Sequence, residues 1–194
     1  DWDDRLKRFS QTLVEQIDAL SAIATSFSDF AKMPKGEFNN EDLNETIKSV
    51  IALFVENNQQ IIFNTDGLGS YFVSADKNQL IRVLNNLIKN AIQAIRDKKD
   101  GEIVIFLKQT GEEYLLTIAD NGVGISDNLK HKIFSPNFTT KTGGMGLGLA
   151  MVKNIVKSMN GEIWFESEEG IGTTFFIKLP KNMNEDQENN FQQK

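Results

Sequence analysis

The hexapeptide DNGVGI at residues 120–125 directly follows an apolar run at residues 114–119 that has the length and composition of a strand. By itself, Asp-Asn-Gly is an ordinary turn signal. A carboxylate at the end of an apolar strand can, however, accept a hydrogen bond from an exocyclic amine such as that of adenine. Gly122 and Gly124 would let the backbone approach a flat base without a Cβ in the way. The stretch therefore indicates either a tight turn or the wall of a nucleotide site.

Two asparagines upstream, Asn86 and Asn90, lie four residues apart in a helix predicted at residues 77–97, so they share one face. Apolar neighbours such as Leu87 and Ile88 place that face at the edge of the core. An amide oxygen there can ligate Mg²⁺, which prefers hard oxygen ligands together with phosphate oxygens. Taken alone, the pattern is better explained by two amides that cap or bond neighbouring backbone.

A glycine-rich segment, GGMGLG at residues 143–148, precedes a helix predicted at residues 147–159. Backbone N–H groups at a helix N-terminus bind phosphate. The segment is not a Walker A motif, because no Gly-Lys-Ser/Thr ends it, and it does not follow a strand as a Rossmann loop does. Lys141 offers a cation for terminal phosphates. A flexible linker is the alternative for this segment alone.

A fourth segment, GIGTTF at residues 170–175, lies in a hairpin predicted from residues 162–167 and 173–179. All four segments occur in an order that could surround one nucleotide, and together they predict a nucleotide site. They resemble the N, G1, G2 and G3 boxes of the histidine-kinase branch of the GHKL ATP-binding superfamily, over about residues 40–181. The stretch IFSPNFTTK at residues 133–141 resembles the family's F box.

The resemblance implies an α+β fold, a two-layer α/β sandwich in which a mixed sheet carries helices on one face, preceded by a long N-terminal helix. By position, Asp120 would bind the adenine amine, Asn90 would ligate Mg²⁺, Asn86 and Lys141 would contact phosphates, and Thr173 would lie near adenine. The remaining nucleotide-binding positions that the resemblance implies are Gly122, Gly124, Ile125, Gly144, Gly146, Leu147 and Gly148. Residues 126–143 would form a mobile ATP lid. Gln93 stands where some of these kinases have a basic residue.

Residues 1–33 carry a heptad pattern, with Leu6, Leu13, Leu20 and Phe27 in one register and Ser10, Ile17, Ala24 and Ala31 in the other. The pattern predicts a helix of a coiled coil or four-helix bundle, which needs a partner helix. Packing onto its own domain is the alternative. The helix resembles the second helix of the dimerisation bundle in nitrogen-regulation sensor kinases, and its resemblance implies a homodimer. A linker is expected at residues 34–40, a catalytic domain at 41–181, and a disordered tail at 182–194.

Further elements are expected as a helix beginning at Asp42, a strand at residues 60–65 and a turn at residues 66–69. The net charge of −6 argues against a nucleic-acid partner and against direct membrane contact. Cysteine is absent, and no apolar run is long enough to span a bilayer. The chain begins at Asp1 within a helical pattern, so we expect a cytoplasmic fragment of a larger protein, whose parent could be membrane-anchored.

The resemblance implies an ATP-dependent protein-histidine kinase that relays the phosphoryl group to a response-regulator receiver domain. The only histidine, His131, lies in the predicted lid, so the phosphoacceptor is expected on a preceding helix and no self-phosphorylation is expected of these residues. A GHKL ATPase is a second hypothesis. Such an enzyme needs a glutamate four residues before the magnesium asparagine, where this chain has Asn86, which cannot act as a general base. A serine kinase of the superfamily or a non-enzymatic nucleotide-sensing dimer would also fit these motifs.

Overall fold

The computed structural model describes residues 2–31, 36–54, 60–67, 69–136, 138–139 and 146–182. The predicted tail, apart from Asn182, and residues 34–35 of the predicted linker lie outside these residues. The helices and strands within them, in chain order, are α1 (Trp2–Ala31), β1 (Asn39–Asp42), α2 (Leu43–Ala52), β2 (Gln60–Thr65), β3 (Phe72–Ala75), α3 (Lys77–Ala94), β4 (Glu102–Thr110), β5 (Glu113–Asp120), α4 (Asp127–Lys130), α5 (Gly148–Ser158), β6 (Glu162–Glu168) and β7 (Gly172–Pro180).

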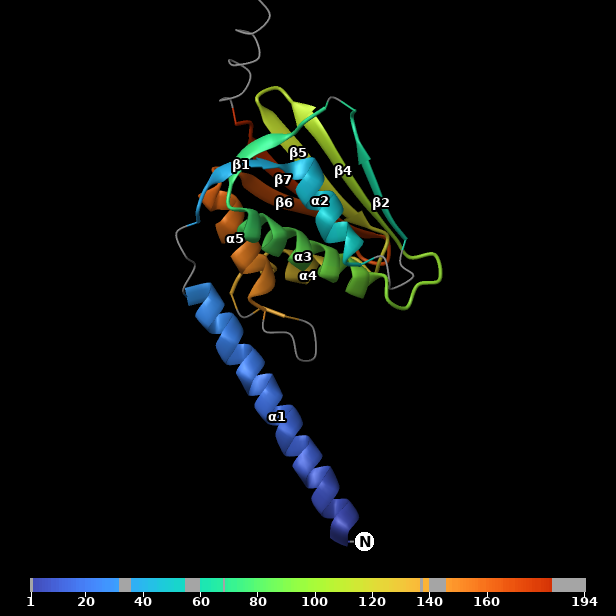
Figure 1. Ribbon diagram of the computed structural model, residues 1–194. Coiled ribbons are helices and arrows are strands. Elements are labelled where there is room, and N and C mark those ends of the chain that lie inside the picture. The colour runs from blue at the N-terminus through green and yellow to red at the C-terminus, as the bar shows by residue number, and fades with distance from the viewer. Residues whose placement is uncertain are drawn as a thin grey trace, which may run out of the picture.

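Five strands form one mixed sheet in the order β2-β4-β5-β7-β6. β2 runs parallel to β4, and the other neighbouring pairs are antiparallel. The helices α2, α3 and α5 cover one face of this sheet (Figure 1). The structure therefore confirms the predicted two-layer sandwich with a mixed sheet and helices on one face.

The alternation of side chains along the strands explains why only one face is covered. In β4 the fully buried residues are every second one, Ile103, Ile105 and Leu107, and the intervening side chains are half-buried on the other face. The facing helix α3 presents a stripe of apolar residues with helical spacing, which runs from Leu80 through Leu84 and Leu87 to Ala91. Each large aliphatic side chain buried in this way stabilises the fold by about 1.5–3 kcal/mol.

The helix α3 begins where the sequence predicted and ends earlier. Asp76 caps its N-terminus, because its side chain accepts a hydrogen bond from the N–H of Gln79 (3.0 Å). The predicted end at residue 97 is wrong: the helix ends at Ala94, whose carbonyl accepts a hydrogen bond from the N–H of Val123 (3.1 Å). The end of the helix is thus tied to a loop that is distant in the sequence, and local periodicity could not show this.

A second, two-stranded sheet was not predicted. β1 and β3 pair antiparallel, with Asn39 opposite Ala75 and Asp42 opposite Phe72. The four residues of β1 are all polar, which contradicts the usual composition of a strand. β1 also begins inside the segment expected to be a linker. It ends at Asp42, which caps α2 by accepting the N–H of Asn44 (2.9 Å), close to the predicted start of that helix.

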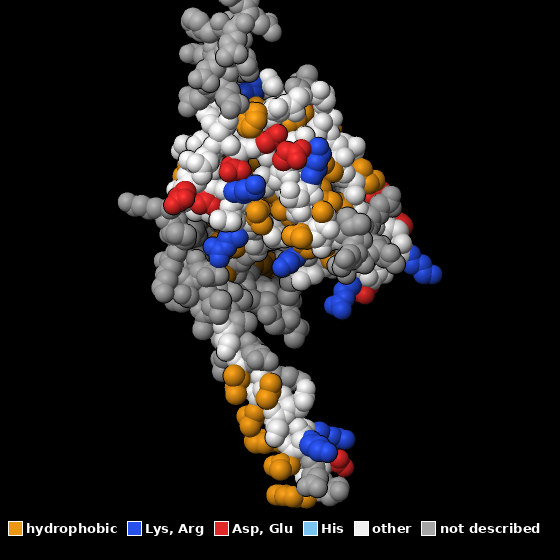
Figure 2. Space-filling model, viewed as in Figure 1, with side chains coloured by type: hydrophobic (Ala, Val, Ile, Leu, Met, Phe, Trp, Pro, Cys, Tyr) orange, Lys and Arg blue, Asp and Glu red, His pale blue; other side chains and the backbone are white. Residues whose placement is uncertain are grey.

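The long helix α1 confirms the predicted helical pattern and carries an uncovered apolar stripe. Figure 2 shows hydrophobic side chains along one side of this helix. The exposed large apolar residues of α1 are Trp2, Leu6, Phe9, Leu13, Val14 and Ile17, which expose between 47% and 76% of their surface. The later heptad side chains Leu20, Ala24, Phe27 and Ala31 lie outside the described ones. In the described part of the chain, no helix is both long and apolar enough to cross a membrane.

Candidate nucleotide site

Three polar side chains form a row across neighbouring strands at one end of the sheet. Asp120, the last residue of β5, pairs with Thr173 of β7, and Thr173 pairs with Ser167 of β6. Thr173 is buried, with 6% of its surface exposed, and it belongs to the alternating set of β7 residues that faces the helices. Directly opposed residues of antiparallel strands hold their Cβ atoms about 4.5–5.5 Å apart. The three side chains are therefore neighbours on the helix-covered face.

The carboxylate of Asp120 is half-buried at the end of this row. Its Oδ1 accepts the N–H of Gly122 (2.9 Å). Burial raises the pKa of Asp120 above its ordinary value of 3.8, and the backbone N–H groups of Gly122 and Thr173 oppose the rise only in part. A carboxylate offers about four lone-pair positions, so acceptor capacity remains for a ligand donor. The geometry suits an exocyclic amine.

The loop after Asp120 is anchored by Asn121, which sequence reasoning treated only as a turn residue. Its Oδ1 accepts the N–H of Glu102 (2.9 Å), and its Nδ2 donates to the carbonyl of Asp100 (2.8 Å). The backbone carbonyl of Asn121 also accepts from the Nζ of Lys98 (2.6 Å). These bonds tie the end of β5 to the start of β4 and thereby hold Asp120 in place. The sequence carried no signal of this, because all the partners are backbone groups except one lysine.

The glycines of the DNGVGI stretch are required by contacts within the chain. A Cβ on Gly122 would lie 2.5 Å from the carbonyl carbon and oxygen of Ala94. Gly124 has φ of +67°, and a Cβ there would lie 2.0 Å from the carbonyl oxygen of Glu168. The expected reason for these glycines was access of a flat base. The structure gives a further one, which is that the loop packs against the end of α3 and against the β6–β7 turn.

We expect Gly124→Ala to destabilise the fold by about 3 kcal/mol or more, because it combines left-handed backbone strain with a clash against backbone. The matched control is Gly111→Ala. Gly111 has a similar φ of +60° but has nothing within 4 Å of the added Cβ, so it should cost only about 1 kcal/mol. Urea unfolding of both variants measures the difference. Equal losses would show that the contact with Glu168 is not tight.

Asn86 and Asn90 lie on α3, both half-buried, and Asn86 abuts the start of α5. The Nδ2 of Asn86 donates to the carbonyl of Arg82 (2.8 Å), so this amide does bond neighbouring backbone. Its Oδ1 remains directed at α5, where a Cβ on Gly148 would lie 2.6 Å from it. The structure therefore brings Asn86 together with the last glycine of the GGMGLG segment.

The glycine-rich segment is described only in its second half. Gly146 has φ of +65°, Leu147 is the N-cap residue of α5, and Gly148 is the first residue of the helix. The predicted phosphate contacts at Lys141 and Gly144 lie outside the described residues. The backbone at Gly148, where α5 begins, therefore lies next to α3. A phosphate site between these two helices would need this arrangement.

The first part of the predicted lid packs on the sheet. Ser126 precedes the short helix α4, and His131 is exposed at the end of that helix. Phe134 contacts Phe165 and Phe175 edge-on, with ring centroids 5.9 and 6.4 Å apart, and Lys153 lies 5.3 Å from the centre of the Phe134 ring. An aromatic anchor of this kind holds the start of the lid segment to β6 and β7.

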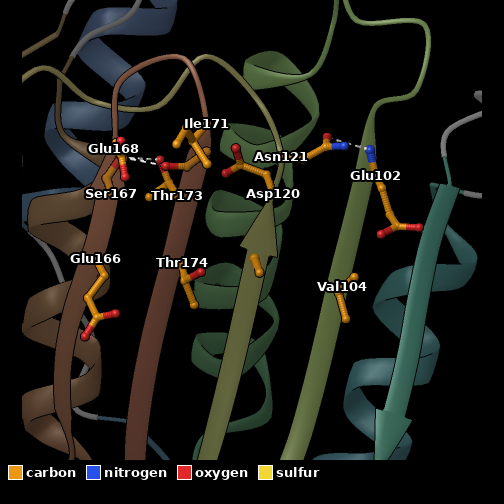
Figure 3. Close-up of a pocket in the computed structure, with 12 residues that line it drawn as sticks. Glu102, Val104, Asp120, Asn121, Glu166, Ser167, Glu168, Ile171, Thr173 and Thr174 are labelled. Atoms are coloured by element: carbon orange, nitrogen blue, oxygen red, sulfur yellow. Dashed lines mark hydrogen bonds between the residues drawn. The ribbon is translucent and has the colours of Figure 1, made fainter.

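A pocket of about 460 Å³ lies at the same strand ends (Figure 3). Val104, Ala119 and Thr174 line it, and these residues alternate with the buried ones, so the pocket opens on the face without helices. In Figure 3 the helices lie behind the strands that carry these side chains. The pocket thus opens on the face opposite Asn86, Asn90 and Gly148, but at the strand ends it shares Asp120, Ser167 and Thr173 with the row described above.

Comparison with known proteins settles the family. The sequence profile described as histidine kinase-, DNA gyrase B- and HSP90-like ATPase matches residues 75–183, more than half of the chain. The chain belongs to this family. The match contains the DNGVGI stretch, the α3 asparagines and the glycine-rich segment, and it confirms the resemblance to the GHKL superfamily.

A sporulation kinase and a nitrogen regulation protein are among the curated relatives of this family member. Sporulation kinase B of Bacillus subtilis is 32% identical over 177 residues, which are 90% of this chain and 41% of that protein. Nitrogen regulation protein NtrY of Azorhizobium caulinodans is 28% identical over 176 residues, 88% of this chain and 23% of that protein. The chain thus spans less than half the length of either relative.

Solved structures of the family confirm the fold. The catalytic domain of histidine kinase ThkA is 38% identical with a TM-score of 0.67, covering 75% of this chain and 96% of that one. A complex of ThkA with response regulator protein TrrA gives 29% identity and a TM-score of 0.71, covering 93% of this chain and 52% of that one. The fold is that of a histidine-kinase catalytic domain.

Proposed function

We propose that the chain is the ATP-binding catalytic domain of a sensor histidine kinase. It would direct the γ-phosphoryl group of Mg-ATP to a histidine outside these 194 residues, for relay to an aspartate of a response regulator. The proposal is carried by one arrangement: Asp120 offers acceptors at the end of β5, while Asn86 abuts the start of α5 on the same face. An adenine amine and a phosphate chain would need groups of these two kinds.

The proposed site residues fall into two groups, one that binds the base and one that binds the phosphates. Asp120 and Thr173 would bind and orient the base, and Gly122, Gly124 and Ile125 would form the loop beneath it. Asn86 and the N–H groups at Gly146, Leu147 and Gly148 would hold phosphates, with Lys141 and Gly144 completing that loop. Mg²⁺, when bound with ATP, supplies neutralisation of the phosphate charge.

Asn90 is the protein ligand that we propose for that ion. The described residues contain no group of three histidine, cysteine or acidic side chains that could hold a metal. The donor set nevertheless fits Mg²⁺ bound with ATP, because one amide oxygen from α3 can join phosphate oxygens and waters around it.

Asn86 favours a kinase over an ATPase. It occupies the position at which hydrolytic members of the superfamily use a glutamate, and a carboxamide cannot take a proton from water. Its amide nitrogen is also committed to the carbonyl of Arg82. Transfer would then depend on positioning of ATP and of an incoming imidazole. His131 is a poor candidate for that imidazole because it follows α4 in the predicted lid and not on the preceding helix that the resemblance implies.

Incubation with γ-labelled Mg-ATP tests the proposal, with the parent chain extended upstream through its preceding helix and the 194-residue chain as control. Acid-labile, base-stable label on the longer chain alone is the expected result. Free phosphate without protein label would replace the kinase by an ATPase. ATP binding without either product would indicate a nucleotide-sensing module, and no ATP binding at all would overturn the nucleotide site.

We also propose that the parent protein is a homodimer joined through α1. The support is the uncovered apolar stripe of that helix, since such a stripe is costly in water and is covered when two helices pack. A response-regulator receiver domain is the second proposed partner, because the relative ThkA has been solved in complex with response regulator protein TrrA.

Replacing Leu6 and Leu13 by glutamate should raise the dissociation constant of the dimer at least about tenfold, because burial of each leucine contributes about 1.5–3 kcal/mol. The charge-matched control is Gln11→Glu with Thr12→Glu, two exposed positions of α1 outside the heptad seam. Sedimentation equilibrium measures both. If the two double variants behave like the unaltered chain, the stripe packs against something other than a second copy.

A further inference from the structure

The hydroxyl group of Ser167 makes three contacts, although its role was not predicted from the sequence. Its Oγ lies 2.8 Å from the backbone nitrogen of Ile125, 2.9 Å from the carbonyl oxygen of Gly172 and 2.9 Å from the Oγ1 of Thr173. The close-up in Figure 3 shows Ser167 beside Thr173, with dashed lines between the two strands. Ser167 therefore lies at the end of the row that contains Asp120.

Only one arrangement of protons satisfies all three contacts. The N–H of Ile125 donates to Ser167, because a backbone nitrogen cannot accept. A carbonyl oxygen has no proton, so Ser167 must donate its own proton to Gly172. The contact with Thr173 is then left for the proton of Thr173, which donates to the second lone pair of Ser167.

This arrangement fixes the direction of the Thr173 hydroxyl. Ser167 lies on β6 and Asp120 on β5, on opposite sides of Thr173 in the sheet. The proton of Thr173 points toward Ser167, so only lone pairs of its oxygen remain for a group bound beside Asp120. Asp120 and Thr173 thus present acceptors alone, one from each strand.

We infer that Ser167 is a positioning residue that sets base specificity by holding Thr173 as a hydrogen-bond acceptor. This inference rests on the proposed function, because it takes the base to lie beside Asp120. An exocyclic amine carries two N–H groups and matches two acceptors, directly or through a water. A ring carbonyl at that place, as in hypoxanthine or guanine, would face acceptors on both sides and leave them unpaired.

The test is isothermal calorimetry with ATP and with inosine triphosphate, which has a carbonyl where ATP has the amine. The unaltered chain should prefer ATP by about a hundredfold, as expected when a site built for a donor meets an acceptor. Ser167→Ala frees the Thr173 hydroxyl to turn its proton toward the base. The ATP preference should then fall about tenfold. Ser167→Thr keeps the hydroxyl and should restore the preference.

A double-mutant cycle separates this role from a structural one. Thr173→Val should itself reduce the preference, and adding Ser167→Ala to it should change the preference no further, since Ser167 would act through Thr173. If Ser167→Ala does not fold, Ser167→Cys, a weak hydrogen-bonding group of similar size, takes its place with the same expected loss.

Three results would overturn the inference while leaving the nucleotide site intact. The first is that Ser167→Ala weakens ATP and inosine triphosphate binding equally. The second is that the effects of Ser167→Ala and Thr173→Val on the preference add in the double variant, and the third is that the unaltered chain binds both nucleotides equally. Failure of the unaltered chain to bind either nucleotide would instead overturn the proposed function.

Discussion

Asp120→Asn is expected to weaken ATP binding by about a hundredfold or more while leaving the fold at least as stable. The backbone N–H of Gly122 donates to the side chain at this position, so the single oxygen of an asparagine would turn toward Gly122. Its NH₂ group would then meet the adenine amine, donor against donor. A lost charge-assisted hydrogen bond together with an unsatisfied donor amounts to about 3 kcal/mol.

The expected stability of the Asp120→Asn variant follows from the direction of the pKa shift of Asp120. Burial raises the pKa of Asp120 in the folded protein above 3.8, so the folded state disfavours the ionised carboxylate. Above the raised pKa the ionised Asp120 costs stability relative to the neutral acid. That cost shrinks as the pH falls below the raised pKa and is gone below the ordinary value of 3.8. Asparagine removes the cost at neutral pH, so the melting temperature should stay the same or rise.

The same shift predicts that ATP affinity falls as the pH is lowered through the raised pKa of Asp120, because protonation removes acceptor capacity. Calorimetric titration over a pH series measures the ATP affinity, and thermal unfolding measures the stability. Asp97→Asn is the control, since Asp97 is exposed just beyond α3 and its substitution makes the same change in charge. Unchanged ATP affinity in Asp120→Asn would remove Asp120 from the site.

Asn90→Ala is expected to separate nucleotide binding from phosphoryl transfer. The contacts to adenine lie on β5 and β7 and should survive, whereas the dependence of ATP affinity on Mg²⁺ should disappear. Label transfer in the extended parent chain should fall by at least about a hundredfold, because charge neutralisation of the phosphates supplies much of the catalysis in such reactions.

Asn85→Ala is the matched control for this variant. Asn85 is a half-buried asparagine of the same helix, but it does not lie on the face shared by Asn86 and Asn90. Calorimetry with and without Mg²⁺ and the labelling assay compare the two variants. If both retain magnesium dependence and label transfer, the metal is held by a residue other than Asn90.

The layered fold and the positions of the motifs could be predicted because they depend on local periodicity. Alternating apolar residues in β4 and β5 and the helical stripe of α3 follow directly from the need to bury one face of each element. The order of the four motifs then predicted a nucleotide site, and the family match confirmed the resemblance.

The features that escaped prediction all depend on partners distant in the chain. The polar strand β1 exists because β3 pairs with it, and α3 ends at Ala94 because Val123 takes that carbonyl. Ser167 gave no signal, since a serine in a strand is commonplace until its partners are placed. The roles proposed for Asn86, Asn90 and the described glycines remain predictions that the experiments above address.

The row formed by Asp120, Thr173 and Ser167 also has a consequence for folding. Ser167 accepts a hydrogen bond from Ile125, which is 42 positions away in the sequence. The site therefore exists only after the long-range pairing of β5, β7 and β6 is complete. Long-range strand pairing of this kind is intrinsically slow to form. A ligand that binds only the completed row stabilises the folded state by about 2.7 kcal/mol at a hundred times its dissociation constant. Nucleotide supply in the cell would therefore protect the newly made domain from unfolding and degradation.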